Sequence, residues 1–299
     1  MIESAIVKSL PPPQFAFVPE LPEVEVLVRH LAPLLRNNTV RNVEVRRARV
    51  IAPTSIRKLK TSLRGAKFTD ITRRGKFLLF TFKTAKKAVP FKLVGHLGMT
   101  GRMYLLPAQN ALPKHAAVVL NLGDENFVFE DTRYFGRFTL DLSALKKLGP
   151  EPLGEEFSTE SFAAGLSKSR QPIKVKLLDQ SLVAGIGNIY ASEALFRAKI
   201  SPKLSARRLK IDQIERLRQS IQYVLTEAIE CGSAVQLDYA GVEARDRLFY
   251  FGSADASVSY EERLRVYDRE GQPCTVCGTP IRRIVQAARS TFYCRQCQR

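Results

Sequence analysis

Four of the five cysteines lie near the end of the chain, where their thiolates could bind a metal ion. The spacing C-x2-C-x16-C-x2-C lets two tight knuckles converge on one tetrahedral ion, and four thiolates favour zinc. Because four thiolates leave no coordination position for water, we expect one structural Zn2+ and no catalysis by the metal. The expected ligands are Cys274, Cys277, Cys294 and Cys297. Cys231 stands apart and is expected to pack in the interior.

Positive charge dominates the chain, and part of it lies between the two cysteine pairs, at Arg282, Arg283 and Arg289. The whole chain has 47 Lys and Arg against 29 Asp and Glu, a formal net charge of +18. Such an excess is easiest to explain if a polyanion binds the protein, and nucleic acid is the leading candidate. An anionic membrane would favour a single basic amphipathic helix, whereas the basic residues here are spread over all regions. The cysteines alone leave open whether their ribbon binds a partner or only stabilises the chain.

A glycine turn, Gly185-Ile186-Gly187-Asn188, separates two helical patterns. The glycines permit positive φ angles, and Asn188 could then cap the second helix. The free N–H groups at the start of that helix would bind a phosphate well. A Gly-x-Gly turn is more often only structural, so this motif gains weight from the strongly basic composition of the chain.

Length and composition exclude several classes of protein. A chain of 299 residues is longer than one hydrophobic core usually organises, so we expect two or more domains. With 45% hydrophobic and 25% charged residues, the chain has the balance of a folded globular protein and not of a disordered one. No apolar run approaches the roughly 18 residues that span a bilayer, and the first residues lack the pattern of an export signal. We therefore expect a soluble protein that is neither exported nor bound to a membrane.

The first half of the chain predicts one helix followed by strands. Apolar residues recur at helical spacing over Leu21–Leu35 despite Pro33, and Pro22 suits the first turn. Glycine-punctuated β-rich segments then predict an all-β sandwich or barrel fronted by that helix. These segments are Val40–Val45, Phe77–Phe82, Phe91–Val94, Ala116–Leu122, Phe127–Glu130 and Arg137–Leu140.

The second half predicts helices. Leu148–Glu156 contains two glycines and two prolines and indicates a linker. Helical periodicity follows in Ser158–Ser167, Ile173–Leu182, Ile189–Ala198 and Ile211–Glu230, and a polar loop then runs to about Ala256. The fold class is therefore α+β and multidomain. We expect an extension at 1–18, a β-sandwich domain at 19–147, the linker at 148–156, a helical domain at 157–256 and a zinc ribbon at 257–299.

Six motifs resemble those of formamidopyrimidine-DNA glycosylases and occur in the same order as in that family. They span the chain from residue 19 to its C-terminal end, which makes chance a poor explanation. The motifs are Pro19 to Glu25 (PELPEVE), His96 to Gly101 (HLGMTG), Asp131 to Gly136 (DTRYFG), Leu148 to Leu153 (LGPEPL), Gly185 to Glu193 (GIGNIYASE) and Arg289 to Gln298 (RSTFYCRQCQ).

The resemblance implies a bacterial base-excision repair enzyme that acts on double-stranded DNA as a monomer. Its first domain would be catalytic, its second a helix-two-turn-helix DNA-binding domain, and DNA would lie in the cleft between them. The implied reaction is excision of oxidised purines such as 8-oxoguanine and formamidopyrimidines, followed by β,δ-elimination at the abasic sugar. An endonuclease VIII-like enzyme for oxidised pyrimidines and a catalytically silent binder of damaged DNA are the alternatives. The resemblance also implies a cytoplasmic protein that works at the nucleoid.

The resemblance implies a nucleophile at Pro19. A free α-amine has a pKa of roughly 8 against about 10.4 for lysine, so a useful fraction is neutral near pH 7. Glu20 would be the acid or base that opens the sugar ring, and Glu23 a supporting carboxylate. Without the resemblance, two glutamates at the start of a helix would be ordinary partners of the helix dipole.

Other residues match DNA contacts of the family. Lys76 matches the lysine that holds the phosphodiester near the lesion. Met99, Arg133 and Phe135 match the residues that enter the duplex when the base leaves, although Met99 and Phe135 would otherwise be expected in a core. The remaining expected DNA contacts are His115, Lys174, Asn188, Tyr190 and Arg289. The loop Ser233 to Asp246 corresponds to the segment that covers the extruded base.

Two features depart from the family pattern. Eighteen residues precede Pro19, and the tertiary amide of an internal proline has no basic lone pair. We expect that translation begins at a GTG codon read here as Val18, after which removal of methionine frees Pro19; proteolytic trimming is the alternative. Ala116 and Ala117 stand where the family commonly has an acid and a second histidine, so one phosphate contact is expected to be missing. His30 and His96 are expected to be structural.

Overall fold

The computed structural model describes residues 19–85, 87–233 and 264–299. The extension expected at 1–18, the domain boundary expected at residue 256 and the loop expected beyond Ser233 lie outside these residues. Among the described helices, none is long and apolar enough to cross a membrane.

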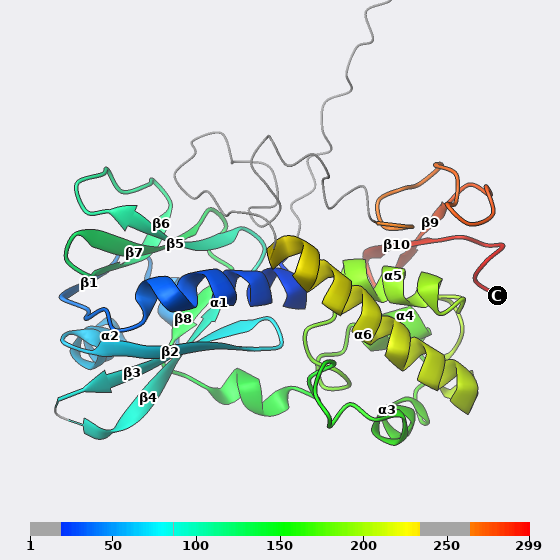
Figure 1. Ribbon diagram of the computed structural model, residues 1–299, viewed down its shortest axis with the longest axis horizontal. Coiled ribbons are helices and arrows are strands. Elements are labelled where there is room, and N and C mark those ends of the chain that lie inside the picture. Colours follow the sequence, from blue (N-terminus) through cyan, green and yellow to red (C-terminus); the bar gives the residue numbers. More distant parts are fainter. Residues whose placement is uncertain (1–18, 86, 234–263) are drawn as a thin grey trace, which may run out of the picture.

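Two antiparallel four-stranded sheets follow a leading helix, α1 (Leu21–Leu35). One sheet has the order β1-β6-β7-β5, formed by Asn42–Val45, Ala116–Asn121, Glu125–Asp131 and Gly101–Pro107. The other has the order β2-β3-β4-β8, formed by Lys67–Arg74, Phe77–Thr84, Lys87–His96 and Arg137–Thr139. Shorter helical elements lie at η1 (Ala48–Ile51), α2 (Ile56–Leu63) and η2 (Ser143–Lys147). Figure 1 shows both sheets beside α1.

Phenylalanines from the two sheets meet in the core between them. The ring of Phe127 on β7 lies 5.6 Å from that of Phe80 on β3 and 6.3 Å from that of Phe68 on β2. All three side chains are fully buried. Burial of these rings supplies the hydrophobic stabilisation that a two-layer sandwich needs. The predicted sandwich with one leading helix is confirmed.

The second half of the described chain is helical, as predicted. It comprises α3 (Thr159–Leu166), α4 (Ile173–Leu177), α5 (Asn188–Arg197), η3 (Ala206–Arg208) and α6 (Ile211–Ser233). The helix predicted over 173–182 ends at Leu177, because polar side chains compete for the backbone beyond it. Asp179 accepts hydrogen bonds from the N–H and the hydroxyl of Ser181, and Gln180 accepts one from the N–H of Gly185.

A two-stranded hairpin of β9 (Arg282–Gln286) and β10 (Arg289–Tyr293) closes the chain. Its two-residue turn has Ala287 at φ 47° and Ala288 at φ 57°, the two positive angles of a type I′ turn. The hairpin lies next to α5 (Figure 1). The predicted zinc ribbon is therefore a hairpin that packs on the helical domain.

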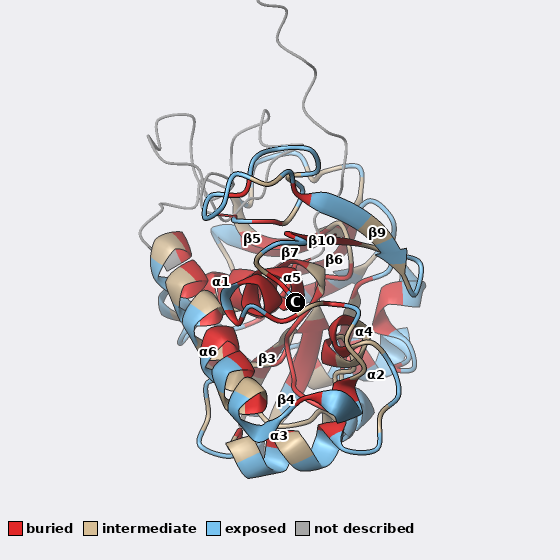
Figure 2. Cartoon of the chain, turned by 90° about the vertical axis from the view of Figure 1, so that its right-hand side faces the viewer, coloured by how far each residue is buried: buried red, intermediate tan, exposed pale blue. Residues whose placement is uncertain are grey.

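Helix α1 belongs to both halves of the molecule. Leu21 at its start lies in the core of the helical domain, whereas Val24 lies in the core of the sandwich. The helix contacts both β2 and α6. In Figure 2, α1 and α5 are coloured as buried over most of their length. The N-terminal end of α1 thus sits where the two domains meet.

Candidate active site and nucleic-acid interface

The carboxylate of Glu20 lies at the N-terminal end of α5. Its Oε2 accepts hydrogen bonds from the backbone N–H groups of Gly187 (2.7 Å) and Tyr190 (3.4 Å), and Oε1 accepts one from Ile189 (2.9 Å). Glu20 is only 2% exposed, so these bonds replace the water that a buried carboxylate would need. The positive end of the helix dipole stabilises the same charge. A helix of the second domain therefore fixes the side chain that precedes α1.

Both positions of the turn must be glycine, because side chains from elsewhere in the chain approach its backbone too closely to leave room for a Cβ atom. A Cβ at Gly187 would overlap the carboxyl group of Glu20 and stand 2.5 Å from Nζ of Lys76. Gly185 has φ +87°, and a Cβ there would stand 2.6 Å from Cδ1 of Leu21. The motif therefore brings the Glu20 carboxylate and the Lys76 ammonium to one point.

Glu23 is a second buried carboxyl group beside Glu20. Its Oε2 accepts a hydrogen bond of 2.8 Å from the backbone N–H of Glu20, and its Oε1 accepts one of 2.7 Å from the Tyr190 hydroxyl. Burial and, to a lesser degree, the charge of Glu20 raise the pKa of Glu23 from 4.5 to about 7, although the bond from Tyr190 opposes the shift. Tyr190 was expected to contact DNA, but its ring is 1% exposed and its hydroxyl points to Glu23.

Lys76 and Pro19 complete this junction. Pro19 is buried and directly precedes Glu20. Burial lowers the pKa of Lys76, the carboxylates of Glu20 and Glu23 oppose this shift, and Arg289 adds to it. The two carboxylates, the lysine and an arginine of the cysteine hairpin are therefore close enough to affect one another's charge.

The turn between β2 and β3 places Lys76, and the linker holds this turn. Glu151 of the linker accepts hydrogen bonds from Arg73 Nη1 (2.7 Å), Arg74 Nη1 (2.8 Å) and the backbone N–H of Gly75 (2.6 Å). Arg73 Nε donates to Glu25 on α1 at 2.8 Å. With its side chain only 10% exposed, Arg73 has two carboxylate partners that offset its burial. The LGPEPL motif contains Glu151, but its role could not be predicted, because no local pattern links a linker residue to a distant strand turn.

A basic cluster lies around the start of α5: Lys76, Lys174, Asn188, Tyr267 and Arg289. Lys174 Nζ donates to Oδ1 of Asn188 and to the carbonyl of Ser290, and Asn188 Nδ2 donates to the same carbonyl at 3.0 Å. Burial lowers the pKa of Lys174 to about 8, and the nearby Arg289 contributes to the shift. The Tyr267 hydroxyl is hydrogen bonded to Asn188.

The cap predicted at Asn188 is wrong. The N-cap of α5 is Gly187, and Asn188 lies inside the first turn. The carboxylate of Glu20 accepts the N–H groups of Ile189 and Tyr190, which an N-cap side chain at position 187 would otherwise take. The amide of Asn188 is therefore free of the capping role and links Lys174 to the cysteine hairpin.

The expected duplex-entering residues lie on two loops that Asp131 holds together. Asp131 accepts hydrogen bonds from the hydroxyl of Thr100 (2.6 Å) and the backbone N–H groups of Arg133 (3.1 Å) and Gly136 (2.8 Å). Met99 is partly buried, whereas Arg133 is exposed and Phe135 is 43% exposed. Phe135 is therefore not a core residue. An exposed phenylalanine on a loop that is held by hydrogen bonds is typical of a surface that binds a partner.

Histidines stand near both parts of the site. His115 Nδ1 lies 3.3 Å from the hydroxyl of Tyr134, whereas Ala116 and Ala117 are buried in β6. His96 Nδ1 accepts the N–H of Gly98 at 3.1 Å, so the neutral ring carries its hydrogen on Nε2. Burial and then the charge of Lys76 lower the pKa of His96 to about 4. His96, for which we expected only a structural role, therefore offers an N–H donor near Lys76.

The four cysteines of the two pairs converge. Their sulfur atoms all lie within 4.8 Å of one another, with 3.9 Å between Cys274 and Cys297 and 3.4 Å between Cys277 and Cys294. A tetrahedral zinc ion with Zn–S bonds of about 2.3 Å needs sulfur separations of about 3.8 Å, so the set fits zinc. The ion would cross-link the hairpin and has no coordination position left for a substrate.

Glu193 of α5 attaches the zinc module, residues 264–299, to the helical domain. Its carboxylate accepts the backbone N–H groups of Arg265 (2.9 Å), Val266 (2.9 Å) and Tyr267 (2.8 Å). Burial raises the pKa of Glu193 and the three N–H donors oppose the shift. One helix, α5, thus orients Glu20 at its start and the segment that carries Tyr267 further along.

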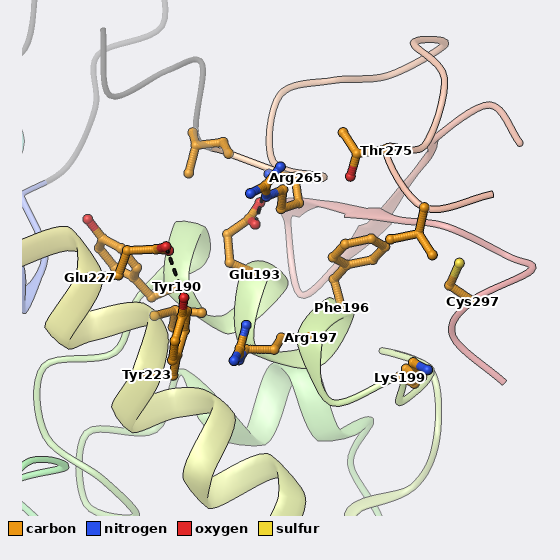
Figure 3. Close-up of a pocket in the computed structure, with 13 residues that line it drawn as sticks. Tyr190, Glu193, Phe196, Arg197, Lys199, Tyr223, Glu227, Arg265, Thr275 and Cys297 are labelled. Carbon is orange, nitrogen blue, oxygen red and sulfur yellow. Dashed lines mark hydrogen bonds between the residues drawn. The ribbon is translucent and has the colours of Figure 1, made fainter. Parts of the chain in front are cut away.

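A cavity of about 440 Å³ lies between α5, α6 and the zinc module (Figure 3). Its walls include Phe196, Arg197, Tyr223 and Arg265, and the hydroxyl of Tyr223 donates to Glu227 at 3.2 Å. The residues that line it do not include Glu20, Lys76, Lys174 or Arg289. The cavity therefore adjoins the candidate site only through Tyr190 and does not hold its charged residues.

Fold and site together define a two-domain protein with a buried carboxylate and a basic cluster at the domain junction and a four-cysteine zinc module. The sequence model of the formamidopyrimidine-DNA glycosylase N-terminal domain matches residues 18–138, and that of the formamidopyrimidine-DNA glycosylase H2TH domain matches residues 148–238. The model of the zinc finger found in FPG and IleRS matches residues 271–299. The chain belongs to the formamidopyrimidine-DNA glycosylase family.

Similar proteins cover almost the whole chain. The formamidopyrimidine-DNA glycosylase of Thermus thermophilus is 38% identical over 288 residues, which are 94% of this chain and 98% of that protein. That of Symbiobacterium thermophilum is 40% identical over 289 residues, 94% of this chain and 89% of that protein. Among solved structures, Lactococcus lactis FPG (MutM) with Fapy-dG-containing DNA has a TM-score of 0.80 at 33% identity, covering 93% of this chain and 99% of that one. MutM with carbocyclic 8-oxo-G-containing DNA has a TM-score of 0.81 at 33% identity, covering 94% of this chain and 99% of that one.

Proposed function

We propose that this chain is a base-excision repair DNA glycosylase with AP lyase activity, which removes oxidised purines from double-stranded DNA. The observation that carries the proposal is the meeting of the Glu20 carboxylate and the Lys76 ammonium at Gly187, directly beside Pro19. The named relatives are formamidopyrimidine-DNA glycosylases, and similar structures hold Fapy-dG and 8-oxo-G DNA. Neither an oxidised-pyrimidine enzyme nor a silent binder is favoured by these relatives.

The proposed reaction begins at the nitrogen of Pro19. A free amine attacks C1′ of the damaged nucleotide, the bond from C1′ to the base breaks, and the base leaves with the electron pair and takes up a proton. Opening of the sugar ring at O4′ then gives an iminium ion between Pro19 and C1′. Loss of a C2′ proton expels the 3′ phosphate, loss of the C4′ proton then expels the 5′ phosphate, and water hydrolyses the remaining iminium bond to free Pro19.

Glu20 is proposed to move the protons at O4′. Three backbone N–H donors fix its carboxylate, so it need not reorient during the reaction. Glu23 supports it by accepting the N–H of Glu20, and Tyr190 supports Glu23. We propose that Tyr190 acts on DNA only through this pair, because its side chain is buried.

The basic cluster is proposed to bind the phosphates around the lesion. Lys76, Lys174 and Arg289 supply charge, whereas Asn188 and Tyr267 supply hydrogen-bond donors. The Nε2–H of His96 lies near the same place, and His115 is proposed as a contact of the other strand. Because such contacts release counterions, the logarithm of the DNA-binding constant falls linearly with the logarithm of the salt concentration. The slope is about −0.9 for each phosphate that is neutralised.

Met99, Arg133 and Phe135 are proposed to fill the space that the extruded nucleotide leaves. Attack at C1′ requires that the damaged nucleotide leave the stack, which costs stacking and pairing energy. A partly buried methionine and an exposed phenylalanine on loops fixed by Asp131 suit insertion between base pairs.

The zinc ion held by Cys274, Cys277, Cys294 and Cys297 is structural. It fixes the hairpin that carries Arg289 and Ser290. We also propose the division into a catalytic domain at 19–147, a linker at 148–156, a DNA-binding domain at 157–256 and a zinc finger at 257–299. We further propose that the protein works as a monomer at the nucleoid, in the cytoplasm; the similar proteins come from bacteria, and the similar structures are complexes with DNA.

Pro19 must have a free nitrogen for this chemistry. We propose that the active form begins at Pro19, and the match to the N-terminal domain model, which begins at residue 18, supports this. The test is borohydride trapping with DNA containing 8-oxoguanine opposite cytosine, using the 299-residue chain and a chain that begins at Pro19. A covalent adduct with the second chain and none with the first is the expected result. If neither chain gives an adduct, the proposed enzyme activity is wrong and the protein only binds DNA. If the intact mass of the protein from its native cell still includes residues 1–18, the proposed start is wrong.

A further inference from the structure

Two arginines of one short segment lie over two neighbouring aromatic rings. The guanidinium carbon of Arg47 stands 5.2 Å from the ring centroid of Tyr134, and that of Arg49 stands 5.7 Å from the ring centroid of Phe135. Both rings belong to the wedge loop, residues 132–136, which also carries Arg133. The guanidinium of Arg133 lies 5.0 Å from the same ring of Phe135. All three distances are within the range of cation–π attraction.

The backbone of the arginine segment is fixed. The N–H groups of Arg46 and Arg47 both donate to the carbonyl of Ala117, at 2.9 and 3.1 Å. Val50 and Ile51 of η1 are buried in the sandwich. Because the residues on either side are held, Arg47 and Arg49 project from a rigid support, and both are exposed.

The wedge loop itself has an unusual conformation. Tyr134 has φ +54°, a left-handed angle that a bulky side chain seldom adopts. Phe135 is 43% exposed, so the hydrophobic core does not fix its ring. A ring that enters a base stack works best if its orientation is set in advance, because no ordering then has to occur on insertion.

We propose that Arg47 and Arg49 are positioning residues of the wedge loop: Arg49 holds the ring of Phe135 in the orientation needed for insertion into the duplex, and Arg47 holds the neighbouring ring of Tyr134, which packs on the sandwich core. The inference rests on the proposed function only in taking damaged duplex DNA as the partner. Arg47 is hydrogen bonded through its backbone to Ala117, the position where the family commonly has a histidine.

The test measures insertion without chemistry. The full 299-residue chain is mixed with a duplex that has a tetrahydrofuran abasic analogue opposite cytosine and 2-aminopurine as the neighbouring base. Because the analogue cannot be cleaved, the signal does not depend on the nitrogen of Pro19. Arg49→Gln is expected to slow the fluorescence rise that reports unstacking by about two- to five-fold, the range that an exposed cation–π contact supports. Arg49→Lys should restore part of the rate, because it keeps a cation over the ring.

Arg46→Gln is the matched control. It removes the same charge from the same segment, but Arg46 contacts Glu44 and the carbonyl of Pro113 and no ring in the described structure. We expect an unchanged insertion rate with this variant and an unchanged melting temperature with all three. Arg47→Gln, paired with Tyr134→Ala, repeats the design for the second ring.

A double-mutant cycle decides between positioning and simple phosphate binding. If Arg49 acts through Phe135, Arg49→Gln has no further effect in a Phe135→Ala background. An equal effect in both backgrounds, with a shallower salt dependence, would show a phosphate contact and overturn the proposal. An Arg49→Gln rate equal to wild type, or a wild-type chain that gives no insertion signal, would overturn it as well. A chain that inserts but gives no borohydride adduct after release of Pro19 would refute the proposed function and leave this inference standing.

Discussion

The hydroxyl of Tyr190 donates a hydrogen bond of 2.7 Å to the carboxylate of Glu23, and so joins the two domains through two buried side chains. Tyr190 lies on α5 and Glu23 on α1. The same two helices are joined by the bonds from α5 to Glu20. The carboxyl groups that the proposed chemistry uses are thus part of the contact between domains.

Glu23 should make stability depend on pH. Its pKa is raised to about 7 in the folded protein from the ordinary 4.5, so between these values the folded state binds more protons than the unfolded state. The contribution of Glu23 to stability is therefore fully present below pH 4.5. As the pH rises from there to about 7, the free energy of unfolding falls by up to about 3 kcal/mol. Glu23→Gln keeps both hydrogen bonds, because its amide can accept from Glu20 and donate to the hydroxyl of Tyr190.

The unfolding free energy of wild type, measured in urea, should fall between pH 5 and pH 8, and that of Glu23→Gln should fall less. The exposed Glu155→Gln serves as control and should follow wild type. Parallel curves for wild type and Glu23→Gln would show that the buried carboxyl group does not titrate in this range.

Gly187→Ala should remove activity with little loss of fold. The added methyl group would overlap the Glu20 carboxyl group and stand 2.5 Å from Nζ of Lys76, so both must move. Displacement of a reacting group by about 1 Å costs on the order of 100-fold in rate, and we expect single-turnover excision to fall by at least that factor. Gly154→Ala is the control, because its Cβ would make only ordinary contacts at 3.5 Å. Equal rates for the two variants would contradict the proposed role of Glu20.

Glu151→Gln should disturb the turn that carries Lys76. The change leaves Arg73 and Arg74 without a charged acceptor on the linker, and the loss should destabilise the protein by about 2 kcal/mol. Because Lys76 is proposed to hold the phosphodiester, we expect KM for damaged duplex to rise about ten-fold. Thermal melting and steady-state excision measure the two effects. With Glu155→Gln, also a glutamate of this region but exposed, neither quantity should change.

Loss of zinc should weaken DNA binding and leave the sandwich folded. The small core beneath the hairpin consists of few residues, among them Cys274, Cys294 and Phe196 of α5, so the metal is needed to fix Arg289 and Ser290 beside Lys174. Cys297→Ser should lose the one bound zinc, measured by elemental analysis, and reduce duplex affinity at least about ten-fold, because several phosphate contacts go together. Cys231→Ser should retain both zinc and affinity. Full affinity in a zinc-free protein would show that the module does not contact DNA.

Regular periodicity made much of the fold predictable. Helix α1 has the predicted bounds, and α6 begins at the predicted Ile211, because apolar residues recur at helical spacing in both. Strand β2 was missed, since Phe68 and Ile71 are its only buried residues and give little alternation. The helix predicted to reach Leu182 ends early through side-chain bonds of Asp179 and Gln180 that no periodicity reveals.

The residue types of the site could be named from the resemblance, whereas their geometry could not. Glu20 and Lys76 lie beside the same residue, Gly187, although they stand far apart in the chain. Tyr267 was missed, and Glu151 was given no role within the LGPEPL motif, because their roles come from long-range contacts with Asn188 and Arg73. The capping role of Asn188 was wrong for a similar reason, since Glu20, far away in the chain, accepts the N–H groups of Ile189 and Tyr190.

The dependence of Glu20 on α5 also bears on how the protein is made. A polypeptide still being synthesised presents Pro19, Glu20 and Lys76 long before the ribosome reaches Gly187. Until the amides of Gly187 and Ile189 have emerged and docked, the carboxylate of Glu20, the proposed acid or base, lacks the bonds from α5 that fix it. On the proposed mechanism, an unfinished chain therefore cannot cut a strand before its DNA-binding domain has folded.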